Sequence, residues 1–188
     1  MHTIRAFYQS DLNPEIILVL NAGFFNLWKD LCIEHNFNIP HRLVENGDQR
    51  FHSVKNGLEF VEDNSIVAVH DGVRPIVSNE LITRAFSLAN QKKAVVPVVM
   101  SRDSVRLKTG GRTAALKRQD VLLVQTPQVF DTSLLKLAYL QPFNDEFTDD
   151  ASVVEAMGAD IFTIEGDYKN IKITYPEDLR LAEVLIKS

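Results

Sequence analysis

The sequence predicts an α/β protein built on an open, mostly parallel sheet. Short, almost wholly apolar runs recur at residues 16–20, 66–70, 94–100, 121–125 and 161–164, with a weaker run at 171–174. Uninterrupted Val, Ile and Leu runs of this length suit strands that are covered on both faces. Helical patterns separate the runs, and this alternation is typical of parallel sheets with crossover helices, which place ligands at the carboxyl ends of strands.

Three helices are predicted in the first half of the chain. Residues 1–7 have a helical pattern from the first positions, and apolar residues at helical spacing mark a second helix at Val54, Leu58 and Val61. The third helix begins after Ser78, a suitable N-cap. Its apolar positions are Leu81, Ile82, Ala85 and Phe86.

Two more helices are predicted near the C-terminus. Residues 150–157 end at Gly158, as a helix C-terminus should, and either Thr148 or Asp149 could cap their first turn. Pro176 opens the last helix, and two acidic residues follow it in the first turn. One face of that helix carries Leu179, Ala182 and Ile186.

Residues 102–118 break the alternation of strands and helices. Polar and apolar residues alternate on both sides of Gly110-Gly111, a strong hairpin-turn pair, so a protruding β-arm is predicted. A lone hairpin is marginal in water, and this one carries apolar residues that need a partner surface. We therefore expect the arm to pack on a second subunit in a homodimer.

Composition limits the classes of protein. The chain has 188 residues, 45% hydrophobic and 24% charged, with no linker that divides it, so we expect one domain over residues 1–188. The net charge of -5 argues against a nucleic-acid partner. Cys32 is the single cysteine, and no apolar run approaches membrane-spanning length, so we expect a cytoplasmic protein without a membrane partner.

Two loops are candidates for ligand binding. The segment from Gly47 to Ser53 precedes a helix, whose free N–H groups and positive dipole end attract anions, although a simple helix cap with a solvated arginine is the alternative. The second loop, from His70 to Pro75, follows an apolar strand. Asp71, Gly72 and Arg74 offer an acceptor, a close backbone approach and an anion donor there, or else a local ion pair in a turn.

Other polar residues are ambiguous by themselves. Lys117 and Arg118 end the predicted arm and could be solvated surface, and Lys172 could protect an edge strand. His70 suits a packed strand end better than a metal ligand. The five histidines have no zinc spacing, and the acidic residues 145–150 have no calcium-loop spacing, so no protein-held metal is expected.

The order of the motifs is specific where single motifs are not. The chain contains, in sequence, G-D-x-R-x-x-S, H-D-G-V-R-P, R-D-S, K-R, T-P-Q, T-D-D-A-S and N-I-K-I-T-x-P-E-D-L. This order resembles the 2-C-methyl-D-erythritol 4-phosphate cytidylyltransferase family of the non-mevalonate isoprenoid pathway, along the whole chain. The resemblance implies a Rossmann-like nucleotidyltransferase sheet, a homodimer joined by the β-arm, and cytidylyl transfer from CTP with release of pyrophosphate. It also implies Mg²⁺, bound mainly through the CTP phosphates.

The resemblance also assigns roles to residues. It implies nucleotide binding by Gly47, Asp48, Arg50, Ser53, Gly72 and Lys172. It implies binding of the methylerythritol phosphate by Asp71, Arg74, Ser104, Arg118 and Thr148, with Arg118 reaching across from the partner subunit. The residues implied to be catalytic are Lys172, Arg118, Asp71 and Arg74.

One family feature is missing from the 188 residues. The family's first strand and glycine-rich loop, of the form L-x-A-G-x-G-x-R-M followed by P-K-Q, would be expected before Met1. Leu20 to Phe25 matches only the first four letters of that loop, and we interpret it as a later strand. We therefore expect an N-terminally truncated chain with weak or no activity, because losing even one charge donor costs about 10² to 10³ in rate.

Two alternatives remain open at this point. Ribitol 5-phosphate cytidylyltransferase has a similar fold and shares the G-D-x-R-x-x-S and H-D-G-V-R-P patterns. A non-catalytic short form that dimerises and binds a sugar phosphate without turnover is the alternative from another class.

Overall fold

The computed structural model describes residues 1–187. Its strands are β1 (Ile17–Leu20), β2 (Arg42–Glu45), β3 (Ile66–Val69), β4 (Ala94–Met100), β5 (Arg106–Thr109), β6 (Arg112–Ala115), β7 (Leu122–Val124), β8 (Gln128–Asp131) and β9 (Phe162–Glu165). Its α-helices are α1 (His2–Tyr8), α2 (Phe25–Glu34), α3 (Arg50–Leu58), α4 (Asn79–Lys92), α5 (Thr132–Ala138), α6 (Asp150–Glu155) and α7 (Pro176–Ile186).

The strands form a mixed five-stranded sheet and two smaller ones. The large sheet has the order β3-β8-β4-β7, and β9 pairs with β4. Strands β3, β4 and β9 run in one direction, while β8 and β7 are antiparallel to their neighbours. Strands β1 and β2 pair in parallel as a separate two-stranded sheet. The predicted open α/β architecture of the nucleotidyltransferase type is confirmed, since crossover helices join the strands that share a direction.

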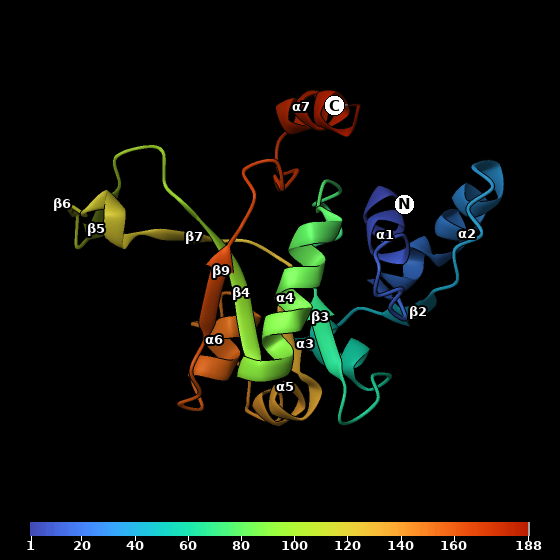
Figure 1. Ribbon diagram of the computed structural model, residues 1–188, viewed down its shortest axis with the longest axis horizontal. Coiled ribbons are helices and arrows are strands. Elements are labelled where there is room, and N and C mark those ends of the chain that lie inside the picture. The colour runs from blue at the N-terminus through green and yellow to red at the C-terminus, as the bar shows by residue number, and fades with distance from the viewer. Residues whose placement is uncertain (188) are drawn as a thin grey trace.

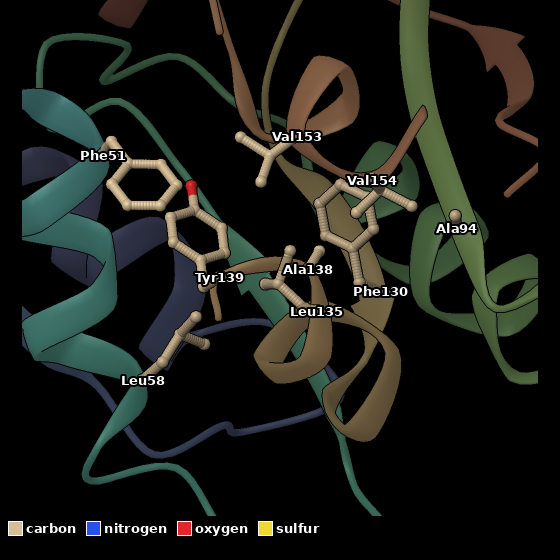
Figure 2. Packing of buried hydrophobic residues seen from close by; sticks show 9 residues of the cluster. All are labelled: Phe51, Leu58, Ala94, Phe130, Leu135, Ala138, Tyr139, Val153 and Val154. Carbon is tan, nitrogen blue, oxygen red and sulfur yellow. The ribbon is translucent and has the colours of Figure 1, made fainter. Parts of the chain in front are cut away.

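Helices cover both faces of the large sheet (Figure 1). Side chains alternate across it, so Val95 and Val129 pack under α4 while their neighbours Ala94 and Phe130 face the other side. Figure 2 shows that second side, where α3, α5 and α6 share one apolar cluster around Tyr139. Helices α3 and α6, which follow the loops of Gly47 and Thr148, are therefore anchored in the same core.

The predicted β-arm is confirmed as a hairpin. Strands β5 and β6 pair through a turn at Gly110 and Gly111, whose φ angles of 54° and 79° lie in the left-handed region that favours glycine. The arm extends away from the large sheet in Figure 1, and every residue of its two strands is exposed.

Most predicted helices and strands are present, and one strand is not. The cap of α6 is Asp149, one of the two predicted candidates, and Ser78 caps α4 as predicted. The prediction of a strand over 171–174 is wrong: that segment is irregular, and its backbone bond to the loop after β3 runs from the Ile173 N–H to the Val73 carbonyl.

The apolar face predicted for α7 is largely exposed. Ala182 is buried, but Leu179 is 53% exposed and Ile186 is 44% exposed. Within residues 1–187, no helix is long and apolar enough to span a bilayer.

Candidate active site

Three of the predicted site residues meet beyond the end of β3. The Asp71 carboxylate lies 3.1 Å from Arg74 Nε and 3.3 Å from Lys172 Nζ. Both distances end on the same oxygen, Oδ2, so one carboxylate oxygen is shared by two cations. Asp71 and Arg74 come from the loop after β3, and Lys172 comes from a segment about a hundred residues later.

The electrostatics of this cluster keep Asp71 ionised. Burial alone would raise the pKa of its carboxyl, but the charge of Lys172 and the hydrogen bond from Arg74 outweigh burial and lower that pKa below its ordinary value. The Arg74 side chain is only 11% exposed, whereas that of Lys172 is 49% exposed. Lys172 therefore presents its ammonium group to solvent, where an anionic ligand can reach it.

Buried polar residues that the sequence analysis did not assign hold this cluster in place. Arg74 Nη1 donates to the Asn170 carbonyl at 2.9 Å, and Asn170 Nδ2 donates to the Thr126 carbonyl at 2.8 Å. Asn170 is fully buried, and that bond fixes its amide orientation, leaving its Oδ1 without a partner among the described residues. Thr126 and Asn170 belong to the T-P-Q and N-I-K motifs, in which the sequence analysis assigned a role only to Lys172.

Gly72 lies beside this cluster at an open position. A Cβ atom built at Gly72 would meet no protein atom within 4 Å. Its carbonyl accepts a bond of 2.8 Å from Thr3 Oγ1, so α1 helps to hold the loop. The glycine therefore leaves its outer face accessible to a ligand.

The loop before α3 depends on a close backbone contact. A Cβ atom at Gly47 would lie 2.3 Å from the Cβ of His52, so a larger residue cannot be accommodated there without displacing α3. The Gly47 N–H donates to Ser53 Oγ at 3.1 Å, and the Ser53 hydroxyl donates to the Gln49 carbonyl at 3.0 Å. The loop is thus folded back on the first turn of α3, with Asp48 exposed at its tip.

Arg50 pairs with a buried acidic residue of the protein. Its guanidinium forms a two-pronged ion pair with Asp150, with Nη1–Oδ1 and Nη2–Oδ2 distances of 3.0 and 2.5 Å. Tyr139 donates its hydroxyl to the same carboxylate at 2.6 Å, and the Asp150 side chain is 0% exposed. We call Arg50, Asp150 and Tyr139 the ionic brace. It joins the first turn of α3 to the first turn of α6.

The pKa values of Arg50 and Tyr139 in the ionic brace are both raised. Burial alone would lower the pKa of Arg50, but the bond to Asp150 raises it. Burial and the charge of Asp150 raise the pKa of Tyr139, so its hydroxyl remains a donor. Figure 2 shows Tyr139 against the ring of Phe51, at a centroid distance of 4.6 Å, which places this hydroxyl at the edge of the apolar cluster.

Thr148 lies directly before the brace, on the loop that feeds α6. It is exposed, and the next residue, Asp149, forms a capping box with Ser152. Gln128 at the start of β8 donates to Asp149 at 2.8 Å and accepts from the Ala151 N–H at 2.9 Å. The strand end, the cap and the brace therefore fix the position from which Thr148 faces outward.

The structure separates the arm residues from the rest of the predicted site. Ser104 and Arg118 are exposed near the base of the arm, which Figure 1 shows extending away from β3 and α3. Arg118 donates to the Arg102 carbonyl at 3.1 Å, and both line an open pocket of about 790 Å³ together with Lys117. The pocket is basic, and it belongs to a different region of this subunit than Asp71.

Protein-held metal is not indicated by the donor chemistry at this site. Asp71, the acid of the cluster, already shares its Oδ2 between Arg74 and Lys172. Among residues 1–187, no three His, Cys, Asp or Glu side chains gather in a way that could hold an ion.

The comparisons with known proteins agree on one family. The sequence model of the 2-C-methyl-D-erythritol 4-phosphate cytidylyltransferase (IspD) family matches residues 1–188. The chain is 50% identical over 186 residues to the protein of that name from Phocaeicola vulgatus, covering 99% of this chain and 85% of that protein. It is 43% identical over 189 residues to the one from Porphyromonas gingivalis, covering 100% and 84%.

Solved structures agree with the sequence match. The crystal structure of 4-diphosphocytidyl-2C-methyl-D-erythritol synthase from Anaerococcus prevotii superposes with a TM-score of 0.86 at 28% identity, covering 100% of this chain and 85% of that one. The 2-C-methyl-D-erythritol 4-phosphate cytidylyltransferase from Thermus thermophilus gives a TM-score of 0.79 at 31% identity, covering 100% and 88%.

Proposed function

The chain belongs to the 2-C-methyl-D-erythritol 4-phosphate cytidylyltransferase family, and on that premise we propose how its residues divide the reaction. The enzyme is a nucleotidyltransferase that transfers the cytidylyl group of CTP to methylerythritol phosphate in the non-mevalonate isoprenoid pathway. The relatives compared above carry the methylerythritol name, so the ribitol 5-phosphate alternative is not favoured.

The cluster of Asp71, Arg74 and Lys172 carries this proposal. A phosphate oxygen of methylerythritol phosphate attacks the α-phosphorus of CTP, a new P–O bond forms, and pyrophosphate leaves with the electrons of the broken α–β bond. Asp71, kept ionised, accepts hydrogen bonds from the sugar hydroxyls, and Arg74 orients them. Lys172 offsets the negative charge that builds on the reacting phosphate, because such transfers depend on positioning and electrostatic stabilisation.

The loop before α3 holds the cytidine in this proposal. Gly47, Asp48 and Ser53 present short polar groups at a helix N-terminus, and Gly72 leaves space for the ribose. Arg50 was predicted to touch the nucleotide, and that contact stays a prediction. Its observed partner is Asp150, so its role in shaping the loop is the one that the geometry supports.

The β-arm of a partner subunit supplies residues that bind the phosphate group of the second substrate. Leu107 is 53% exposed on the arm, and the apolar residues of β7 in the large sheet are exposed as well, which favours burial in a homodimer. Arg118 then reaches into the partner's site and grips the substrate phosphate together with Thr148. Ser104 contributes its hydroxyl at the base of the same arm.

The remaining assignments concern the metal and the compartment. Mg²⁺ would enter with CTP, held mainly by the phosphate oxygens, because the carboxylate of the cluster is already paired with two cations. It would supply charge neutralisation on the triphosphate. We place the protein in the cytoplasm, where a single unpaired cysteine is the ordinary case.

Release of pyrophosphate from CTP tests the proposal. With methylerythritol phosphate as acceptor, Asp71→Asn and Lys172→Gln should each lower the rate by about 10² or more, while the exposed control Lys169→Gln should match the wild type. Equal rates with ribitol 5-phosphate, or binding of the sugar phosphate with no pyrophosphate release, would contradict the assignment.

A further inference from the structure

His70 ties together the two ends of the loop that carries Asp71 and Arg74. Its Nδ1 lies 3.0 Å from Thr126 Oγ1, and its Nε2 lies 3.1 Å from the Arg74 carbonyl. The Asp71 N–H donates to the same Thr126 Oγ1 at 3.1 Å. The contacts therefore close a ring that passes from Asp71 through Thr126 and His70 to Arg74.

Hydrogen-bond chemistry fixes the direction of each bond in this ring. A carbonyl oxygen only accepts, so Nε2 of His70 must carry the proton and donate to Arg74. In a neutral imidazole the other nitrogen is then an acceptor, so Nδ1 accepts the Thr126 hydroxyl proton. The Thr126 oxygen in turn accepts from the Asp71 N–H. Each bond in the ring therefore joins one donor to one acceptor.

The surroundings favour the neutral imidazole that this ring requires. Burial lowers the pKa of His70 to about 4, and the Phe7 ring of α1 packs edge-on against it at a centroid distance of 4.9 Å. The charged groups that face it are Asp71 and Arg74, one of each sign. Thr126 is 5% exposed, so water does not readily replace its hydroxyl.

We propose that His70 and Thr126 are positioning residues for the sugar-phosphate end of the site, holding Asp71 and Arg74 at their observed spacing through this directed ring. We call the pair the imidazole brace. The inference rests on the proposed function, since it assigns Asp71 and Arg74 to the acceptor substrate. Neither member of the brace touches the reacting atoms; each acts through the loop backbone.

Conservative variants separate positioning from general stability. Thr126→Val keeps the shape but leaves His70 Nδ1 and the Asp71 N–H without partners, so the affinity for methylerythritol phosphate should fall about tenfold. The affinity for CTP, measured alone, should change less than twofold. Thr126→Ser keeps the hydroxyl and should bind the sugar phosphate with the affinity of the wild type.

Nitrogen NMR of the His70 ring tests the brace without any ligand. The wild type should show the Nε2–H form between pH 5 and 8, and Thr126→Val should shift the Nδ1 resonance. A proton on Nδ1, or ring protonation near the ordinary pKa of about 6.5, would overturn the brace even if the proposed function is correct. If the ring has the expected form but wild type binds no methylerythritol phosphate, the proposed function fails and the brace stands as a loop support only.

Equal weakening of both ligands in Thr126→Val would overturn the positioning role. So would a Thr126→Val variant that binds methylerythritol phosphate as tightly as the wild type. Calorimetric titration of each ligand separately distinguishes these outcomes, with Thr126→Ser as the matched control.

Discussion

The two braces solve the same problem with different chemistry. The ionic brace uses a buried carboxylate with two donor residues, and it joins the loop before α3 to the Thr148 loop before α6. The imidazole brace uses only neutral partners, and it ties both ends of the Asp71–Arg74 loop together through Thr126. Removing the partner of a buried charge lowers the free energy of unfolding more than removing the partner of a buried neutral group. The comparison predicts a hierarchy of mutational effects.

Removal of the buried carboxylate should have the largest effect. Asp150→Ala leaves the Arg50 guanidinium and the Tyr139 hydroxyl without their acceptor, and we expect a loss of about 3 kcal/mol in the free energy of unfolding. Arg50 is 41% exposed, so partial hydration keeps the loss at the lower end for a broken buried pair. Denaturant titration measures it. The exposed control Asp145→Ala should change stability by less than about 0.5 kcal/mol, and equal losses would refute the brace.

Acid should weaken the protein through His70 before it affects Asp71. The pKa of His70 is lowered to about 4 from 6.5, so the unfolded chain binds more protons between these values and stability falls as the pH falls through that window. From pH 7 to pH 5 the expected loss is about 2 kcal/mol. The pKa of Asp71 is lowered below 3.8, so its stabilising contribution is lost only at still lower pH.

The His70→Asn variant isolates that effect. The pKa of His2 is also lowered, by burial and the N-terminal charge, and it contributes in the same direction. The difference between wild type and His70→Asn in the slope of stability against pH is therefore the quantity to measure. An unchanged slope would show that His70 is not held neutral.

Loss of the two neutral bonds made by the Thr126 hydroxyl should cost less. Thr126→Val should lower the free energy of unfolding by about 1.5 kcal/mol at pH 7, because two groups lose their partner. Thermal unfolding of this variant beside Thr126→Ser checks it, and an equal loss in the serine variant would assign the effect to the methyl group instead.

The smallest effect is expected at the edge of the ionic brace. Tyr139→Phe removes one donor, but Asp150 keeps both bonds from Arg50, so we expect about 1 kcal/mol. A loss as large as that of Asp150→Ala would mean that the hydroxyl, and not the ion pair, holds the two helices together.

The sequence predicted the strands and the site better than it predicted the braces. The run at 94–100 is apolar without interruption, as burial on both faces requires, so β4 was found with its bounds. Asp71, Arg74 and Lys172 were assigned together, and they meet in the structure. The prediction of a strand over 171–174 failed because alternating apolar and polar residues form a strand only beside a partner strand. This segment lies beside a loop and has no partner strand in register.

The braces could not be read from residue types. Asp150 stands one hundred residues from Arg50, and Thr126 stands 56 residues from His70, so only tertiary structure shows that they pair. His70 was correctly interpreted as a packed strand-end histidine. The direction of its hydrogen bonds, however, depends on the positions of the Arg74 carbonyl oxygen and the Thr126 hydroxyl oxygen. Sequence patterns report periodicity and local turns, and long-range polar pairs leave no such period.

One pair of titrations tests the account most directly: CTP and methylerythritol phosphate, each measured alone against wild type, Arg50→Gln and Thr126→Val. The ionic brace joins the loops proposed to bind the two ligands, so Arg50→Gln should weaken both ligands. The imidazole brace supports only the loop of Asp71 and Arg74, so Thr126→Val should weaken methylerythritol phosphate about tenfold and leave CTP within twofold. If Thr126→Val weakens the two ligands equally, the two braces do not serve different parts of the site and the account is contradicted.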